Sequence, residues 1–278
     1  MGMRYPGYIG RAAAFAWALA LSLAVPRAHA CTVFTIVGGE RILFCDNEDF
    51  SNPCTRIWFV PGSGTKRGCV YLGFDDGWGQ NGLNDKGLAY GWVAGFKKGW
   101  QRRPGMKTIR GNPCHQMLES CATVEEAIRF FHEHWEESFS YGRPLVADRT
   151  GKSVILRAKN GKLHAPIVTR SRGMGHRFGM RGDEATPMLA QISKPTLADA
   201  ARLLEFTRQE GVNATKYSVV FDLKTCDIWL YRFPDEPNPV RFNLPREIQR
   251  GPHYYDIPSL PRQLDESLRP LRDEMKND

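Results

Sequence analysis

Cys31 stands directly after the small-x-small tripeptide Ala28-His29-Ala30, and this junction is the most chemically informative feature of the sequence. Cleavage of that bond would leave a first residue that carries a thiol and an α-amine together. The α-amine has a pKa of about 7.7–8.0, so a good fraction of it is a neutral base at working pH. The amine can take the thiol proton, directly or through a water, and later protonate a leaving nitrogen. The junction therefore predicts nucleophilic acyl chemistry at Cys31.

The first thirty residues have the three-part layout of a secretory signal peptide. Arg4 and Arg11 precede an apolar run over 12–25, and the small-x-small site follows. We expect a signal peptidase to remove residues 1–30 and to release a single domain, 31–278, in the periplasm or outside the cell. The alternatives are a buried N-terminal helix or an uncleaved anchor. No later stretch approaches the roughly 18 apolar residues of a membrane helix, so we expect no transmembrane segment after processing.

Two other roles for Cys31 remain open at this point. Lipoprotein signals also end at a cysteine, but they favour leucine three residues earlier, where this chain has Ala28. Cys31 could instead be half of a disulfide, because exported proteins hold disulfides. The odd total of seven cysteines leaves at least one thiol unpaired, and the pairing of the other six cannot be deduced. Those six, which could equally be small buried hydrophobes, are Cys45, Cys54, Cys69, Cys114, Cys121 and Cys226.

A hairpin is predicted to bring acidic residues close to Cys31. Residues 31–37 read as a strand of β-branched and aromatic residues, and Gly38-Gly39 suits a tight turn before a return strand at 41–44. The segment 46–49 (DNED) would then lie just past the second strand, near the start of the first. The alternative interpretation of this segment is a solvated acidic turn.

The remaining pattern predicts an α+β domain of layered antiparallel sheets, not a doubly wound parallel sheet. Strands are expected at 56–60, 70–74, 87–93 and 144–156, and a last hairpin at 217–223 and 227–233. One helix should begin at the capping box of Thr123 and Glu126, and a second should cover 197–209 after the cap Thr196.

Several segments together resemble one family: CTVFTIV at 31–37, DNEDF at 46–50, NDKGLAYG at 84–91, VADRTGKSVIL at 146–156, KYSVVFDLKTCDIWLY at 216–231 and HYYDIPSL at 253–260. They resemble the linear-amide C–N hydrolases of the N-terminal-nucleophile superfamily, which include choloylglycine hydrolases, penicillin V acylases and acyltransferase-like relatives. The resemblance spans nearly the whole of 31–278. It implies a four-layer αββα sandwich of antiparallel sheets and cleavage of non-peptide amides.

Residue roles follow from the resemblance, position by position. Cys31 corresponds to the nucleophile, and Asp49 would hold its α-amine and tune its protonation. Asn47 would bond the substrate or nearby backbone. Arg177 matches a late arginine that lowers the thiol pKa, and Arg181 is the alternative for that role.

The predicted oxyanion donors are less regular. A backbone N–H near Val93 and Ala94 would be one donor. Arg170 stands where the family usually carries an oxyanion-binding asparagine after threonine, and its guanidinium would either donate or block the site. Asp46 stands where the bile-salt and penicillin enzymes carry an arginine, which argues against bile-salt specificity.

These observations predict an exported amidohydrolase that cleaves a small-molecule acyl amide through an acyl-thioester. The alternatives are an acyltransferase on the same scaffold and a lipid-anchored or secreted binding protein without catalysis. No cofactor is implied, and His132-Glu133-His134 lacks metal-ligand spacing. Loss of 1–30 lowers the net charge from +8 to +5, because that segment holds three of the 38 basic residues and none of the 30 acidic ones. With no basic stripe, a nucleic-acid partner is not expected; a homo-oligomer is possible.

Overall fold

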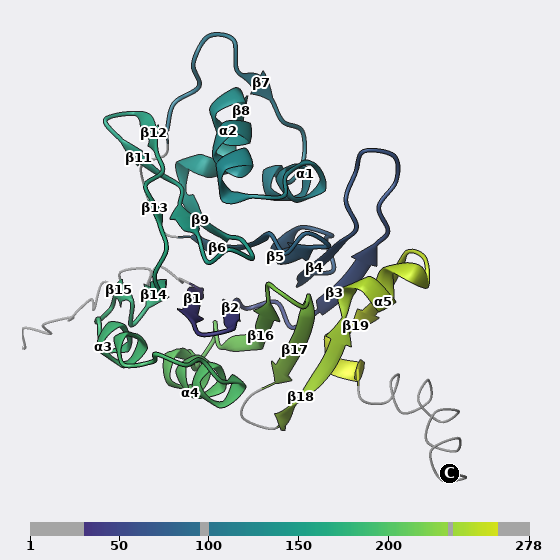
Figure 1. Cartoon of the computed structure of the whole chain (residues 1–278), viewed down its shortest axis with the longest axis vertical. Coiled ribbons are helices and arrows are strands. Elements are labelled where there is room, and N and C mark those ends of the chain that lie inside the picture. The colour runs from purple at the N-terminus through teal and green to yellow at the C-terminus, as the bar shows by residue number, and fades with distance from the viewer. Residues whose placement is uncertain (1–30, 95–99, 233–235, 261–278) are drawn as a thin grey trace, which may run out of the picture.

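Two large β-sheets face each other, and helices cover their outer surfaces (Figure 1). The computed structural model describes residues 31–94, 100–232 and 236–260. Helices α1 (Pro113–Ser120) and α2 (Val124–Glu133) cover one sheet, and α3 (Ala185–Ala190) and α4 (Leu197–Thr207) cover the other. This four-layer arrangement confirms the predicted αββα sandwich.

The first sheet contains the strand that follows Cys31 and runs in the order β15-β14-β1-β2-β16-β17-β18. Its strands are β1 (Thr32–Gly38), β2 (Arg41–Asp49), β14 (Arg172–His176), β15 (Gly179–Met180), β16 (Thr215–Asp222), β17 (Asp227–Arg232) and β18 (Glu236–Asn243). All neighbouring pairs are antiparallel except β14 and β15.

The second sheet is antiparallel throughout and runs in the order β13-β10-β9-β6-β5-β4-β3-β19. Its strands are β3 (Thr55–Val60), β4 (Cys69–Phe74), β5 (Gly79–Asn84), β6 (Ala89–Ala94), β9 (Gly142–Ala147), β10 (Ser153–Ile155), β13 (Ile167–Val168) and β19 (His253–Asp256). Small pairs β7 (Lys107–Thr108) with β8 (His134–Trp135), and β11 (Arg157–Lys159) with β12 (Lys162–His164), lie outside the two sheets, as do α5 (Leu244–Gln249), η1 (Glu137–Ser140) and η2 (Ile257–Ser259).

Most predicted elements are present, and the structure adds several that were not predicted, among them β14, β18, β19, α3 and α5. Strand β5 and helix α1 were also not predicted; α1 begins after the cap Asn112, whose side chain accepts from the Cys114 N–H. The predicted helix starts at Thr123 and Thr196 are confirmed, because each hydroxyl accepts the backbone N–H three residues later. Helix α4 ends at Thr207, earlier than the predicted 209.

Strand β2 differs from the prediction in a way that matters for the site. It does not end at Phe44 but continues to Asp49, and its last four residues are all buried. The segment 46–49 is therefore neither a turn nor solvated. The opposite sheet covers one face of these residues and α4 covers the other, so tertiary packing decides their environment.

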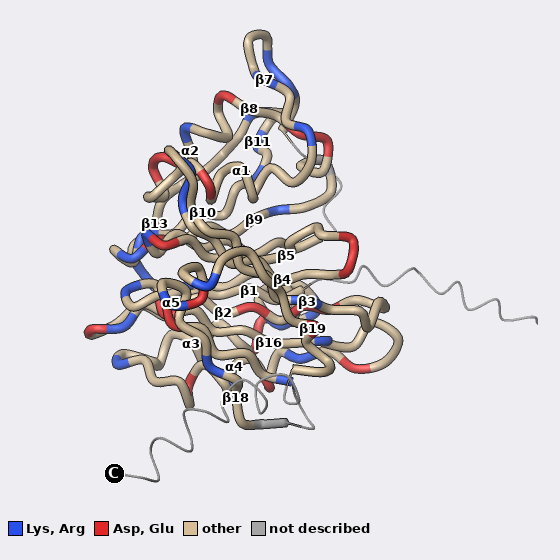
Figure 2. Tube along the Cα trace, turned by 90° about the vertical axis from the view of Figure 1, so that its right-hand side faces the viewer, with Lys and Arg blue, Asp and Glu red and all other residues tan. Residues whose placement is uncertain are grey.

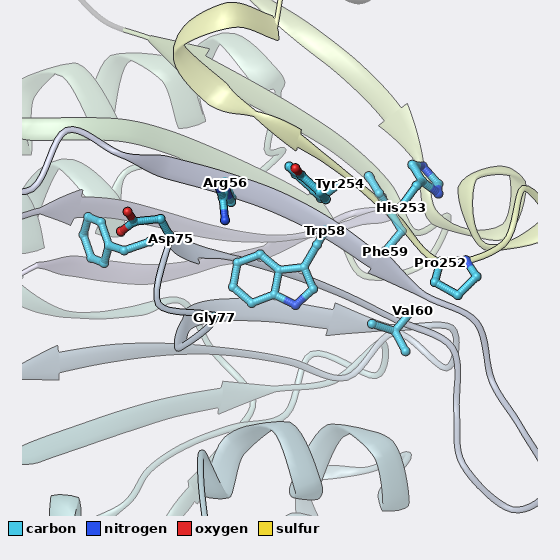
Figure 3. A pocket seen from close by; sticks show the side chains of 10 residues that line it. Arg56, Trp58, Phe59, Val60, Asp75, Gly77, Pro252, His253 and Tyr254 are labelled. Atoms are coloured by element: carbon cyan, nitrogen blue, oxygen red, sulfur yellow. The ribbon is translucent and has the colours of Figure 1, made fainter.

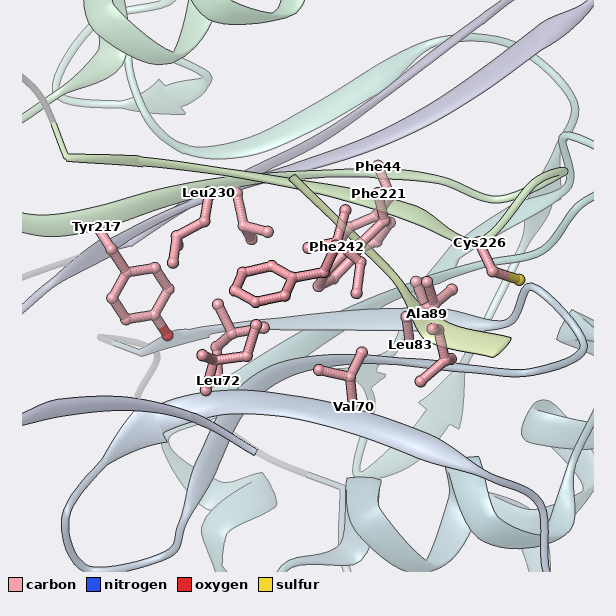
Figure 4. Close-up of a cluster of buried hydrophobic side chains, with 14 of the residues drawn as sticks. Phe44, Val70, Leu72, Leu83, Ala89, Tyr217, Phe221, Cys226, Leu230 and Phe242 are labelled. Atoms are coloured by element: carbon pink, nitrogen blue, oxygen red, sulfur yellow. The ribbon is translucent and has the colours of Figure 1, made fainter. Parts of the chain in front are cut away.

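The main hydrophobic core lies between the two sheets (Figure 4). Phe44 and Phe221 stack there with ring centroids 6.2 Å apart, and Phe242 packs in the same layer. Two smaller clusters lie beneath the helical layers, one under α1 and α2 and one under α3 and α4. With both faces of both sheets packed, residues at the inter-sheet surface are held without solvent.

Charged residues are interspersed along the chain and do not separate into an acidic and a basic face (Figure 2). Within the described ranges, no helix is both long and apolar enough to cross a membrane.

Candidate active site

Cys31 lies at the start of the first strand, at the edge of the inter-sheet layer. The register of β1 and β2 pairs Thr32 with Asn47, so Cys31 lies opposite Glu48. Alternate strand residues point to opposite faces, which directs Asp46 and Glu48 toward the second sheet and Asn47 and Asp49 toward the helices. Two separate polar clusters thus form at the end of β2.

Glu48 is the nearest carboxyl group to the Cys31 sulfur. The Sγ–Oε1 distance is 3.6 Å, and the sulfur also lies 4.0 Å from the backbone oxygen of Asp49. Cys31 is 7% exposed and Glu48 is 2% exposed. The second oxygen of Glu48, Oε2, is buried and has no hydrogen-bond partner among the described residues. The Glu48 carboxyl group is therefore close enough to influence the pKa of the Cys31 thiol.

The surroundings oppose a free thiolate while Cys31 is joined to the residue before it. Burial raises the pKa of the Cys31 thiol well above its ordinary value, and the charges of Glu48, Asp49 and Asp46 raise it further. Burial also raises the pKa of Glu48, followed by repulsion from Asp46 and Asp49. In that form the α-nitrogen is an amide, which is neither a base nor a cation. The uncleaved site therefore favours a neutral, unreactive thiol.

Asp46 sits between the sheets in a network with residues of two other strands. Asn81 Nδ2 on β5 donates to Asp46 Oδ1 at 3.1 Å and to Tyr217 Oη on β16 at 3.2 Å. A Cβ atom on Gly91 would lie 2.3 Å from Asp46 Oδ2, so only glycine lets β6 approach this carboxyl group. Burial, then the charge of Asp49, raises the pKa of Asp46. Asp46 is thus enclosed in the layer that also holds Glu48.

Asp49 is held on the helix side of the sheet. Its Oδ2 accepts from Gln209 Nε2 at 2.6 Å, and its Oδ1 accepts from the Thr215 hydroxyl. Burial raises the pKa of Asp49 to about 7, although both hydrogen bonds and the charges of Arg181 and Lys216 lower it. A carboxyl group with a pKa near neutrality beside a cysteine is suited to proton transfer at the site.

The structure connects Arg181, not Arg177, to this aspartate. Arg181 Nη1 donates to Gln209 Oε1 at 3.3 Å, and Gln209 in turn donates to Asp49. The Arg177 guanidinium lies over the ring of Phe206 in α4, 4.5 Å from its centroid. Arg181 is therefore the arginine that hydrogen bonds join to the candidate site.

Asn47 has a structural role. Its Nδ2 donates to the Leu204 carbonyl at 2.8 Å and to Thr207 Oγ1 at 3.0 Å, both in α4. Its Oδ1 accepts from Ser218 Oγ at 2.6 Å. Of the two contacts predicted for Asn47, the one to backbone is present. The side chain points to the face opposite Cys31's neighbours Asp46 and Glu48, so it is not directed at a substrate there.

Arg170 lies at the wrong end of β1 for the predicted oxyanion contact. The neighbouring Ser171 Oγ accepts from the Val37 N–H at 2.9 Å, which fixes this loop beside the end of β1. The six-residue step from Cys31 to Val37 spans about 20 Å at the usual rise of a strand. Arg170 is also exposed. Strand β14 runs antiparallel to β1 and pairs Arg172 with Thr35, so the structure does not bring Arg170 to Cys31.

Ala94 ends β6 and pairs with Gly142. Residues 95–99, which follow it, lie outside the described residues. The N–H of Ala94 as an oxyanion donor stays a prediction.

Glu48 was not among the residues predicted for the site. Finding Glu48 would have required the length of β2. When the second strand continues past residue 44, the register of β1 and β2 places residue 48 opposite Cys31. Residues 46–49 are all polar, so this segment lacks the alternation of apolar and polar residues that indicates a strand.

The other cysteines do not contribute to this site. All seven are unpaired, and Cys54 is exposed whereas the rest are buried. His132 contacts Arg103 and His134 stacks on Phe130, so the two histidines do not converge.

No protein-family model and no curated protein matches this sequence. Solved structures match it at low identity. Penicillin V acylase from Agrobacterium tumefaciens has a TM-score of 0.61 and 17% identity, over 78% of this chain and 87% of that chain. A variant of conjugated bile acid hydrolase from Clostridium perfringens has a TM-score of 0.64 and 14% identity, over 81% and 96%.

A third match is the Caenorhabditis elegans ortholog of N-acylethanolamine-hydrolyzing acid amidase, with a TM-score of 0.50 and 16% identity over 70% of this chain and 93% of that chain. These likenesses show the fold: the chain shares its αββα sandwich with these solved structures. In this chain the sandwich carries Cys31 at the start of β1, with Glu48 across the hairpin.

Proposed function

We propose that this protein is an exported N-terminal-cysteine amidohydrolase that cleaves non-peptide acyl amides through an acyl-thioester. The observation that carries the proposal is the position of Cys31, at the start of β1 in an αββα sandwich, 3.6 Å from the Glu48 carboxyl group. The solved structures of this fold are named for hydrolysis of penicillin V, conjugated bile acids and N-acylethanolamines, which are all acyl amides.

Cleavage after Ala30 would supply what the uncleaved site lacks. It converts the amide nitrogen of Cys31 into an α-amine, which is a base when neutral and a cation when protonated. The cation would lie beside Glu48 and Asp49, whose charges otherwise raise the pKa of the thiol. A nearby opposite charge favours the ionised form of a carboxyl group, which offsets the effect of burial on its pKa. The acidic surroundings thus fit an enzyme that becomes active on processing.

The chemistry then runs in two balanced steps. The α-amine takes the thiol proton, and the sulfur attacks the carbonyl carbon of the amide. The resulting ammonium gives its proton to the leaving nitrogen, the C–N bond breaks and an amine departs, which leaves an acyl-thioester on Cys31. The amine next takes a proton from water, and the hydroxide attacks the thioester carbonyl. The C–S bond breaks, the ammonium returns its proton to the departing sulfur, and the carboxylic acid is released with the thiol and the neutral amine restored. Glu48 and Asp49 hold the ammonium in both steps.

Export is part of the same proposal. The three-part layout of residues 1–30 supports removal by signal peptidase and a periplasmic or secreted mature protein. N-terminal sequencing of protein recovered from the periplasm and the medium should give Cys-Thr-Val. A mature chain that begins at another residue, or a lipid-modified Cys31, would contradict the proposal.

The decisive test of the reaction is a substrate panel with two matched variants. Penicillin V, a glycine-conjugated bile acid and an N-acylethanolamine are offered to the processed protein, to Cys31→Ser and to Cys54→Ser. Cys31→Ser should keep the fold and lose turnover by at least about 10³-fold, because the nucleophile is weaker and its general base is no longer matched to it. Cys54, which is exposed, should be dispensable. Equal turnover in the wild type and Cys31→Ser would reject the proposal.

A further inference from the structure

A cavity of about 520 Å³ lies where β14 and residues 168–171 meet α3, at the Val37 end of β1. Arg170 and Arg172 are among its lining residues. Its lining residues Val37, Arg172 and Gly173 lie at or pair with positions three to six residues along β1 from Cys31, which is about 10–20 Å at the usual strand rise. It is therefore distinct from the candidate active site, and we call it the arginine cavity.

Arg172 is the unusual residue of the arginine cavity. It is half-buried, and its Nη1 is shielded from solvent with no hydrogen-bond partner in the described part of the chain. Burial lowers the pKa of Arg172, and the nearby charges of Arg157 and Arg170 lower it further. Three arginines thus stand close together, and no carboxylate of the described residues forms an ion pair with Arg172.

Shielding one nitrogen of a cation from solvent without a hydrogen-bond partner is unfavourable, and a bound anion would remove the penalty. The contrast with the groove in Figure 3 supports this interpretation. There, Arg56 pairs with Asp256 at 2.8 Å and lies 5.0 Å from the centroid of the Tyr254 ring. The protein provides a carboxylate for Arg56 and provides none for Arg172, so the arginine cavity is the one arranged for an external anion.

The lining also includes apolar residues. Val37, Leu189 and Ile192 are three of them. Two of the hydroxyl groups are already engaged: Ser171 accepts from the Val37 N–H at 2.9 Å, and Thr186 donates to Asp183. A small inorganic anion would leave the apolar residues uncovered, whereas an apolar chain on the anion would cover them.

We propose that the arginine cavity binds an organic carboxylate with a short apolar chain, its head group on Arg172 and Arg170 and its chain against Val37, Leu189 and Ile192. Arginine suits a carboxylate head because its planar donors match both carboxylate oxygens. The site does not depend on catalysis at Cys31, so it can be tested in the inactive Cys31→Ser protein.

The experiment is calorimetric titration of Cys31→Ser with octanoate, inorganic sulfate and octanol. Octanoate should bind, while sulfate and octanol, which lack the chain and the charge respectively, should each bind at least about tenfold more weakly. In the Cys31→Ser background, Arg172→Gln and Arg170→Gln should each raise the dissociation constant of octanoate about tenfold or more. The control Arg110→Gln removes the same charge from an exposed residue outside the cavity lining and should leave octanoate binding unchanged.

Three results would overturn the proposal. They are no octanoate binding, sulfate binding as tight as octanoate binding, and octanoate binding that Arg172→Gln and Arg170→Gln leave intact. Because Arg170 is exposed, its variant keeps the test decisive if Arg172→Gln does not fold. Since binding is measured without turnover, failure here is separate from failure of the amidohydrolase proposal.

Discussion

The Cys31 sulfur lies 3.6 Å from Oε1 of Glu48, in a layer between two sheets where both residues are buried. The two residues face each other because β1 and β2 form one hairpin whose register pairs Thr32 with Asn47. A thiol in such contact with a carboxyl group is held neutral until a positive charge joins the site. In our account that charge is the α-ammonium released by cleavage after Ala30.

Removing the charge of Glu48 should lower the pKa of the Cys31 thiol in an unprocessed chain. Burial is the largest cause of the raised pKa, and Glu48 is the first of the charged groups that raise it, ahead of Asp49 and Asp46. Glu48→Gln should therefore shift the pH midpoint of iodoacetamide labelling downward, and Asp46→Asn should shift it less. The measurement needs a chain that retains residues 28–30 and a Cys54→Ser background, because Cys54 is exposed. A larger shift for Asp46→Asn would contradict the geometry.

The same unprocessed chain should become less stable as the pH rises from about 4 to about 7. Burial raises the pKa of folded Asp49 to about 7, from 3.8, so the folded state binds this proton more tightly than the unfolded state. The contribution is fully present below about pH 4 and is lost as the pH passes 7, a change of up to about 4 kcal/mol in the free energy of unfolding. Urea denaturation across this range should give the slope, and Asp49→Asn should reduce it. A slope of opposite sign, or a slope that Asp49→Asn leaves unchanged, would refute the assignment of this pH dependence to Asp49.

Gln209 should influence the pKa of Asp49, and Arg177 should not. Gln209 donates to Asp49 at 2.6 Å, a contact that lowers the pKa of the carboxyl group. Gln209→Leu should move the loss of stability to higher pH. Arg177→Gln is the matched test of the arginine predicted from sequence: its guanidinium lies on Phe206, so the Asp49 titration should stay where it is. An equal shift of the Asp49 titration in both variants would show that Arg177 also acts on the site.

Asn47 should matter for stability and not for the chemical step. Its side chain joins β2 to Leu204, Thr207 and Ser218 by three hydrogen bonds. Asn47→Ala should lower the free energy of unfolding by about 2–4 kcal/mol, because buried partners lose their bonds. Asn52→Ala, which removes two exposed bonds, one donated to Asp75 and one accepted from the Cys54 N–H, should cost less than about 1 kcal/mol. Urea denaturation gives both values, and a folded Asn47→Ala with normal stability but no turnover would mean that Asn47 binds substrate.

Local signals in the sequence were sufficient for the turn of the first hairpin and for the helix starts. Gly38-Gly39 separates two apolar runs, and Thr123 and Thr196 cap their helices as their spacing indicates. The environment of 46–49 was beyond such signals. Polar residues there are buried because α4 and the second sheet cover the two faces of β2, and this cover is made by segments more than thirty positions away, such as Asn81 and Leu204.

The candidate site was predictable only in part for the same reason. Cys31 and Asp49 follow from the cleavage junction and a short motif, but Glu48 depends on strand register. Arg170 was assigned from the residue before it, whereas its location depends on the antiparallel pairing of β14 with β1. Motifs specify residue types near one another in the chain; they do not specify which end of a strand a distant segment meets.

The central claim is that a free α-amine on Cys31 makes its thiol catalytic. The most direct measurement compares hydrolysis of one acyl amide by two otherwise identical proteins, one beginning at Cys31 and one retaining residues 28–30. The account predicts that the retained tripeptide lowers turnover by about 10²–10⁴-fold, the usual contribution of general acid–base catalysis, while both proteins fold. Equal turnover by the two proteins would show that the amine has no part in the reaction and would contradict the account.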